Sequence, residues 1–212
     1  MEEDPCVGKL TPLHPIMDAS LMTLDGETFI ASASSFYAPN KEMAYKAFSA
    51  AETSAVPGSD TNQWTTGTPS YETGQFTGTY SCCSTHVDGK VVEGEWLQLQ
   101  CSNTHVLKSF SIMANHWNPC RAPRSFVLAG SEDGVVWSAL QTEQDVGEWT
   151  SKQTRHFIVS SDYAARYFRL ITTAVYGTQS WLTIDKLRLL VREGKHSAPD
   201  GDAVGVMNAG DV

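Results

Sequence analysis

The stretch GEWLQLQCSNTHVLKSFSIMANHWNPCRAPRSFVLAGSEDGVVWSAL, residues 94–140, decides the fold of this chain. Within it, hydrophobic and polar residues alternate in WLQLQ, SFSIM and SFVLAG. A period of two is typical of strands that place one face on a core and the other toward water. Between two such runs, Asp133-Gly134 supplies residues that tolerate a positive φ, which predicts a hairpin turn. The stretch therefore predicts antiparallel β structure.

Similar runs continue along the chain, and turn signals separate them. We expect strands at 29–35, 95–100, 105–114, 124–130, 135–140, 154–160, 166–173 and 182–191. Regular short strands without a long helical period favour a sandwich or a barrel. A short helical turn is expected at 42–48, and residues 68–93 are interpreted as an insertion with one hairpin.

Two motifs resemble the discoidin family, whose members are also called coagulation factor 5/8 type C domains. They are GSEDG at 130–134 followed by Trp137, and YFRL at 167–170. The resemblance covers roughly residues 29–191. It implies an all-β, discoidin-like jelly-roll β-sandwich of galactose-binding type, in a family that mostly binds ligands rather than converting them.

Both ends of the chain lie outside this resemblance. Residues 1–28 contain Pro5, Pro12 and Pro15, and we predict an extended, irregular N-terminal lead-in there. Residues 192–212 are rich in Gly, Ala and Asp, which predicts a flexible C-terminal tail. The expected organisation is one domain at 29–191 between irregular extensions.

Length, charge and cysteine content limit the function classes. The 212 residues are 41% hydrophobic and carry a formal net charge of −9, which suits one domain and disfavours nucleic acid and anionic membranes as partners. The N-terminus MEEDPCVGKL is not a secretory signal, and we expect no membrane insertion. Five cysteines, an odd number, favour a reducing compartment. We therefore expect an intracellular protein of the cytoplasm, cytoskeleton or cilium, with a virion component as a further option.

Catalytic motifs are missing from the sequence. It contains no G-x-S-x-G, H-E-x-x-H, P-loop or G-x-G-x-x-G pattern, so we do not expect an enzyme. The histidines are scattered, and His86 beside Cys82 and Cys83 is the one close cluster with cysteine. Adjacent cysteines rarely ligate one metal without strain, so no metal is predicted there.

The resemblance also implies a calcium site. The family has Asp-Gly after the Ala-Phe of its short helical turn, but here Ser49 follows Phe48. At the position of the family glutamate near the start of the last strand this chain has Asp185 and Lys186, and the favoured register places Lys186 there. Asp60, with carbonyl groups of 49–62, is a weak candidate. The prediction is that the chain holds no cofactor, with calcium less favoured than its absence.

A binding face is implied at one end of the sandwich, in the loops 34–41, 115–123 and 174–181. The candidate residues combine aromatic planes with amide, imidazole and guanidinium groups, a mixture that suits a sugar: Asn115, His116, Trp117, Asn118, Arg121, Tyr176 and Trp181. The alternative is that a tryptophan only caps the core. We favour that alternative for Trp181 and the ligand role for Trp117. Trp64, Trp96 and Trp137 are expected to be structural.

Two functions remain open. The first is a non-catalytic interaction module that is a structural component of a larger intracellular assembly, with other proteins as partners contacted through residues 1–28 and 192–212. The missing signal, the odd number of cysteines and the long extensions favour it. The alternative is a carbohydrate-binding, lectin-like module that uses the 115–123 loop and takes a glycan as its partner.

Overall fold

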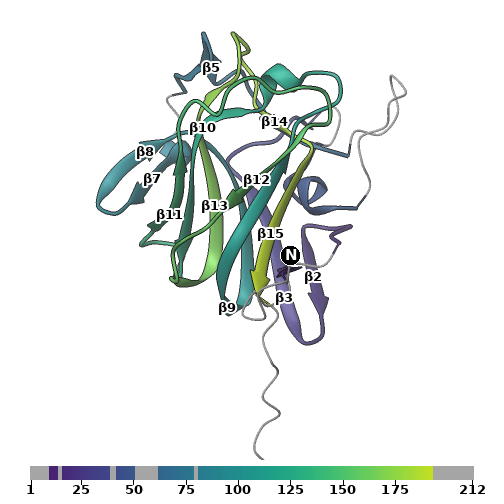
Figure 1. Cartoon of the computed structure of the whole chain (residues 1–212), viewed down its shortest axis with the longest axis vertical. Coiled ribbons are helices and arrows are strands. Elements are labelled where there is room, and N and C mark those ends of the chain that lie inside the picture. Colours follow the sequence, from purple (N-terminus) through teal and green to yellow (C-terminus); the bar gives the residue numbers. More distant parts are fainter. Residues whose placement is uncertain (1–9, 14–15, 39–41, 51–61, 79–80, 193–212) are drawn as a thin grey trace, which may run out of the picture.

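Strands dominate the computed structural model, which describes residues 10–13, 16–38, 42–50, 62–78 and 81–192 (Figure 1). The longest is β9 (Glu95–Met113), in the middle of the stretch on which the sequence analysis rests. Short 3₁₀ turns interrupt the strands, among them η2 (Ala44–Phe48), η3 (Ser81–Cys83) and η4 (Pro119–Arg121). No helix in these ranges is long and apolar enough to cross a membrane. The predicted all-β class is confirmed.

The sandwich has two layers, and β9 belongs to both. Its first half pairs with β3 and β13 in a layer ordered β2-β3-β9-β13-β10-β11. Its second half pairs with β12 and β15 in a layer ordered β1-β15-β9-β12. Figure 1 shows β13 and β15 on either side of this long strand. The sequence runs 95–100 and 105–114, expected as two strands, are therefore one strand that changes layers.

The bounds of the remaining strands are as follows. In the first layer they are β2 (Leu21–Leu24), β3 (Glu27–Ala33), β10 (Pro123–Ser131), β11 (Ser138–Glu143) and β13 (Ala164–Val175), with β5 (Tyr71–Glu72) and β6 (Gln75–Phe76) attached. In the second they are β1 (Leu10–Pro12), β12 (Thr154–Ile158) and β15 (Lys186–Arg192). Two further pairs are β4 (Trp64–Thr65) with β14 (Thr183–Ile184), and β7 (Ser84–Val87) with β8 (Lys90–Glu93).

The core lies between the layers and follows the predicted alternation. Leu97 and Leu99 from the first half of β9 are fully buried, as are Phe110 and Ile112 from the second half. The Phe110 ring stacks on Phe157, with centroids 4.9 Å apart. Because one strand supplies both walls of the core, its hydrophobic residues join the layers into a single folding unit.

The outer face of the first layer is covered rather than exposed to water, which differs from the expected alternation. The β7–β8 hairpin lies over it, and Trp137 is buried there at 3% exposure, as predicted. Trp96 packs against the same small cluster. Residues 68–93 thus hold two hairpins, β5–β6 and β7–β8, instead of one. Turn residues dominate this segment, and strands of two to four residues are too short to show a period.

The predicted hairpin joins β10 and β11, which pair antiparallel. Gly134 has a φ of 78°, as the Asp-Gly pair predicts. The connection is longer than a two-residue turn, and side-chain hydrogen bonds hold its backbone. Asp133 Oδ1 accepts hydrogen bonds from the N–H groups of Val135 (2.8 Å) and Val136 (2.9 Å). These backbone donors, with that of Val136 first, lower the pKa of the Asp133 carboxyl.

The N-terminal segment corrects an expectation. Residues 1–28 were expected to be irregular, yet β1 pairs with β15, and β2 pairs with β3. Met17, between them, is fully buried in the core. These strands have three and four residues, and β1 lies at a sheet edge where Pro12 is tolerated, so neither leaves a clear pattern in the sequence. The predicted tail, beyond residue 192, lies outside the described residues.

Candidate functional site

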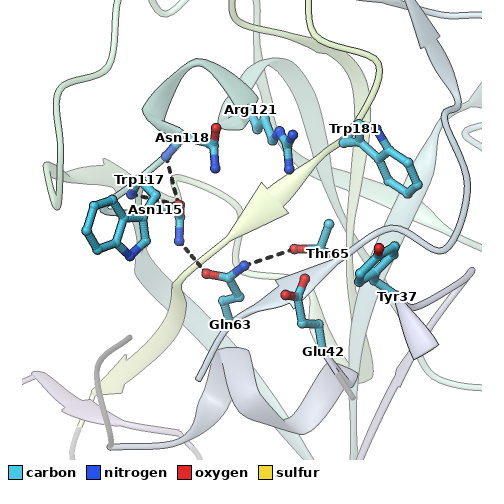
Figure 2. Close-up of a pocket in the computed structure, with 9 residues that line it drawn as sticks. All are labelled: Tyr37, Glu42, Gln63, Thr65, Asn115, Trp117, Asn118, Arg121 and Trp181. Carbon is cyan, nitrogen blue, oxygen red and sulfur yellow. Dashed lines mark hydrogen bonds between the residues drawn. The ribbon is translucent and has the colours of Figure 1, made fainter. Parts of the chain in front are cut away.

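A pocket of about 390 Å³ opens where distant segments of the chain meet (Figure 2). Its lining residues are Tyr37, Glu42, Gln63, Thr65, Asn115, Trp117, Asn118, Arg121 and Trp181. They come from the segment around η2, from β4, from the loop after β9 and from the segment before β14. A volume of this size, within the roughly 300–1,000 Å³ of small-molecule sites, admits a small ligand.

A chain of amide hydrogen bonds forms the floor of the pocket. Asn115 Oδ1 accepts from the backbone N–H of Trp117 (2.9 Å) and of Asn118 (2.8 Å). Its Nδ2 donates to Gln63 Oε1, and Gln63 Nε2 donates to Thr65 Oγ1 over 3.3 Å. This chain holds the 115–121 loop against β4, so the polar rim is largely ordered before a ligand arrives.

Aromatic rings stand on opposite sides of the pocket (Figure 2). Trp117 is 49% exposed, so much of its indole surface faces solvent. Across from it, Trp181 meets Tyr37 edge to face, with centroids 5.5 Å apart and an interplanar angle of 87°. Trp181 is therefore neither a core cap nor an isolated surface residue. It forms a wall of the pocket.

Polar groups project into the space between these walls. Figure 2 shows Arg121, at the end of η4, and Asn118, just before η4, pointing toward Gln63 and Glu42. Within the described ranges the Arg121 side chain donates no hydrogen bond, and its Nε is buried without a partner. A buried donor without a partner costs roughly 1–3 kcal/mol. A ligand that supplied an acceptor here would recover part of that cost.

A buried lysine supports the pocket from below. Lys186 Nζ donates to the carbonyl oxygens of Lys46 (3.1 Å) and Asn62 (2.5 Å). Lys46 lies within η2 and Asn62 lies just before Gln63, so the ammonium group joins two segments next to the pocket. It also binds carbonyl oxygens of the kind that calcium would need. Asp60, the weak calcium candidate, lies outside the described residues, so that expectation stays a prediction.

Most of the predicted binding residues line this pocket, but His116 and Tyr176 do not. His116 Nδ1 lies 2.7 Å from Ser151 Oγ, and its ring meets Trp117 edge-on at 4.7 Å, so it buttresses the indole instead. Tyr176 lies near Glu148, where desolvation and then that carboxylate raise the pKa of its hydroxyl. The bends in the backbone at His116 and Tyr176 direct both side chains away from the pocket. Sequence spacing does not show this.

Other lining residues were not singled out as candidates. Tyr37 falls within the expected 34–41 loop, which was the signal available for it. Gln63 directly precedes Trp64, which is fully buried in the core. Because neighbouring residues of a strand face opposite sides, the sequence could have indicated that Gln63 points away from the core. Glu42 and Thr65 gave no signal, because their place depends on long-range contacts of η2 and β4 with the rest of the sandwich.

Comparisons with known proteins place the fold. No family model and no curated protein matches the sequence. Among solved structures, the F5/8 type C domain of a Bacteroides fragilis protein matches with a TM-score of 0.51 and 12% identity, over 82% of this chain and 97% of that chain. A family 32 carbohydrate-binding module from Clostridium perfringens, in complex with GalNAc-β-1,3-galactose, matches with a TM-score of 0.50 and 15% identity, over 76% and 94%.

These likenesses define the class of fold. The chain has a discoidin-like β-sandwich fold, as the motifs at 130–137 and 167–170 predicted. At these identities the neighbours show the fold alone, and the ligand must be argued from the pocket itself. Among the described lining residues Glu42 is the one carboxylate, whereas glycoside hydrolysis usually needs a pair.

Proposed function

We propose that this domain is a non-catalytic module that binds carbohydrate in the pocket lined by Trp117, Trp181 and Arg121. The observation that carries the proposal is the combination of an exposed indole with a guanidinium that has no hydrogen-bond partner among the described residues. A sugar ring has an apolar C–H face and hydroxyl groups at its edge, so one ligand satisfies both features.

The pocket offers complementary roles to a sugar. Trp117, which is 49% exposed, offers an apolar indole surface to the C–H face of a sugar. Arg121 is a donor without an acceptor, and the Glu42 carboxylate on the opposite side is an acceptor for hydroxyl hydrogens. The ordered Asn115–Gln63 amides reduce the conformational entropy that a ligand must overcome. The C. perfringens neighbour, with the same fold and a disaccharide ligand, supports this class of ligand.

This proposal replaces the assembly hypothesis as the leading one. The assembly role required residues 1–28 to wrap onto other proteins, but the described part of that segment pairs with β3 and β15 of its own sandwich. The structural neighbours reported above also support the carbohydrate alternative better, and they give no support to a ciliary or cytoskeletal role. An intracellular location stays a prediction.

The test is a glycan array with the full chain, followed by calorimetric titration of the best glycan. Trp117→Ala should weaken binding by about 1–3 kcal/mol, or roughly five- to 150-fold, because it removes a stacked ring. Arg121→Ala should weaken it by a similar amount. Arg166→Ala is the matched control, because Arg166 donates to Glu132 O at the β10–β11 turn, away from the pocket. Its affinity should equal that of the wild type.

Two outcomes contradict the proposal. One is the absence of any glycan bound by the folded full chain. The other is a glycan whose affinity is unchanged by both Trp117→Ala and Arg121→Ala, because that ligand would bind elsewhere on the molecule.

A further inference from the structure

A second group of chemically versatile side chains lies where β9 leaves the first layer. Glu27, Cys101 and His105 place a carboxylate oxygen, a thiol sulfur and an imidazole nitrogen within 4.8 Å of one another. The closest pair is His105 Nε2 and Glu27 Oε1, 2.6 Å apart. In Figure 1, β3 and the bend of β9 lie at the lower end of the view, and β14 beside the pocket lies at the upper end.

Strand register explains why these residues meet. Phe29 on β3 pairs with Cys101 on β9, so Glu27 lies two residues beyond, toward the end of the layer. Past Cys101 the strand β9 bends and continues to His105, which pairs with Ala165 of β13. The N–H of Asn103, within the bend, donates to Glu27 Oε1 over 3.3 Å. Backbone pairing thus fixes the positions from which all three side chains start.

We propose that Glu27, Cys101 and His105 form a zinc-binding site. Thiolate, imidazole and carboxylate are the donors that zinc takes in proteins, whereas calcium and magnesium prefer oxygen alone. Three protein ligands leave a fourth tetrahedral position for water. The side chains of His105 and Glu27 are 22% and 16% exposed, so solvent and metal reach the group. Cys101 is buried beneath them at 1% exposure.

The geometry requires only side-chain adjustment. Zinc bonds of about 2.0–2.3 Å hold tetrahedral ligand atoms roughly 3.3–3.7 Å apart. The His105–Glu27 pair must open by about 1 Å and the sulfur must lie within the same sphere, a displacement of the size that side-chain rotation provides. The Asn103 N–H that orients the Glu27 carboxylate is an outer-shell contact of the sort that supports metal ligands.

The charge balance also favours a divalent ion. A thiolate and a carboxylate together offset the two positive charges of zinc, and neutral His105 adds none, so the loaded site is neutral and suits partial burial. Without metal, Cys101 is a buried thiol. Zinc binding forms the S–Zn bond and releases the thiol proton to solvent.

In the sequence, the close cluster of possible metal ligands is Cys82, Cys83 and His86, and no metal is predicted there. Cys101 and His105 do not stand out as a metal site in the sequence, because the third ligand, Glu27, is far away in the chain. In the described part of the chain, Glu27, Cys101 and His105 are the group of such side chains whose ligand atoms lie within 4.8 Å of one another. The two clusters therefore serve as test and control for each other.

The experiment uses the full chain without an affinity tag, stripped with a chelator and titrated with zinc chloride by calorimetry and with cobalt(II) by absorption. One ion should bind per chain, with a thiolate-to-cobalt charge-transfer band. Cys101→Ser should abolish that band. Cys101→Ser and His105→Gln should each weaken zinc binding by more than the roughly 10–100-fold that loss of an outer-shell partner causes.

Cys82→Ser and His86→Gln are the matched controls and should leave the zinc affinity and the cobalt band unchanged. A band that persists in Cys101→Ser, or zinc affinity lost in the controls and kept in His105→Gln, overturns the proposal. So does the absence of zinc binding by the wild type. If Cys101→Ser fails to fold, the partly exposed His105→Gln carries the test. Glycan affinity should be the same with and without zinc, so this site and the pocket fail or succeed separately.

Discussion

The outer face of the first layer and the pocket both combine arginine with tryptophan, and they differ in whether the arginine's hydrogen-bond donors have partners. On the outer face of the first layer, Arg169 lies between Trp96 and Trp137, with its guanidinium carbon 4.1 Å and 4.2 Å from the ring centroids. It donates to Gln98 Oε1 and to Thr85 Oγ1. In the pocket, Arg121 stands near Trp117 and Trp181 without such partners among the described residues.

The presence or absence of hydrogen-bond partners for the arginine separates residues that stabilise the fold from residues that can bind a ligand. Arg169 is enclosed on both faces, and desolvation lowers its pKa to about 10, so it stays protonated near neutral pH. The tryptophan rings and the oxygen acceptors around Arg169 are already in contact with its guanidinium, so they offer no further interaction to a ligand. The pocket contains the same residue types, but Arg121 Nε has no partner among the described residues and Trp117 is 49% exposed. Composition alone therefore does not identify a binding site, whereas hydrogen-bond satisfaction does.

The largest expected effect is a loss of stability when the closed stack is opened. Trp137→Ala should lower the free energy of unfolding by about 3–5 kcal/mol, because it removes a buried ring and one face of the Arg169 sandwich. Trp117→Ala, the matched control, should lower it by less than about 1 kcal/mol, because half of that ring is already exposed. Urea unfolding followed by circular dichroism measures both.

Equal losses for the two variants would contradict the comparison. They would mean that the indole of Trp117 is as much a part of the core as that of Trp137, and the pocket would lose its candidate stacking surface.

The next effect concerns Lys186, the satisfied cation beneath the open pocket. Lys186→Met should lower the free energy of unfolding by roughly 1.5–3 kcal/mol, because the carbonyls of Lys46 and Asn62 lose a charged donor in a buried place. Lys108→Met is the control, since its partner Asp162 is 84% exposed and such surface pairs contribute at most about 1 kcal/mol. Urea titrations of both variants provide the measurement.

Lys186→Met should also weaken glycan binding, because η2 and the segment before β4 are no longer joined beneath Glu42 and Gln63. Unchanged stability together with unchanged glycan affinity would show that the ammonium group does not organise the pocket.

The sequence predicted the fold well because period-two alternation and the Asp133-Gly134 turn are local. It failed where structure depends on long-range pairing. The strands β1 and β2 have three and four residues and are held by β15 and β3, so no local pattern identifies them. The continuity of β9 through its change of layer was hidden by the polar residues 102–104, which are exposed at the bend.

The candidate site was predictable in part, for the same reason. The loop after β9 brings Asn115, Trp117 and Arg121 together within a few residues, so the sequence shows them as a group. Glu42 and Gln63 reach the pocket through tertiary contacts, and the zinc candidates Glu27 and Cys101 meet through strand register. Side-chain direction within a loop, which separates Trp117 from His116, is set by hydrogen bonds such as that of His116 with Ser151.

The smallest expected effect tests the turn that positions the closed stack. The pKa of Asp133 is lowered in the folded state, chiefly by the N–H groups of Val136 and Val135. Its ionised form therefore stabilises the fold at pH values above the unfolded pKa of about 3.9, and this contribution is lost as the pH falls through the lower folded pKa. Asp133→Asn should unfold at lower urea concentration than the wild type at neutral pH, and the gap should close as the pH falls toward about 3. Glu132→Gln removes the same charge one residue away and should show no such closing gap. A pH-independent gap for Asp133→Asn would assign the effect to side-chain shape, and the turn before Trp137 would then owe nothing to the charge of Asp133.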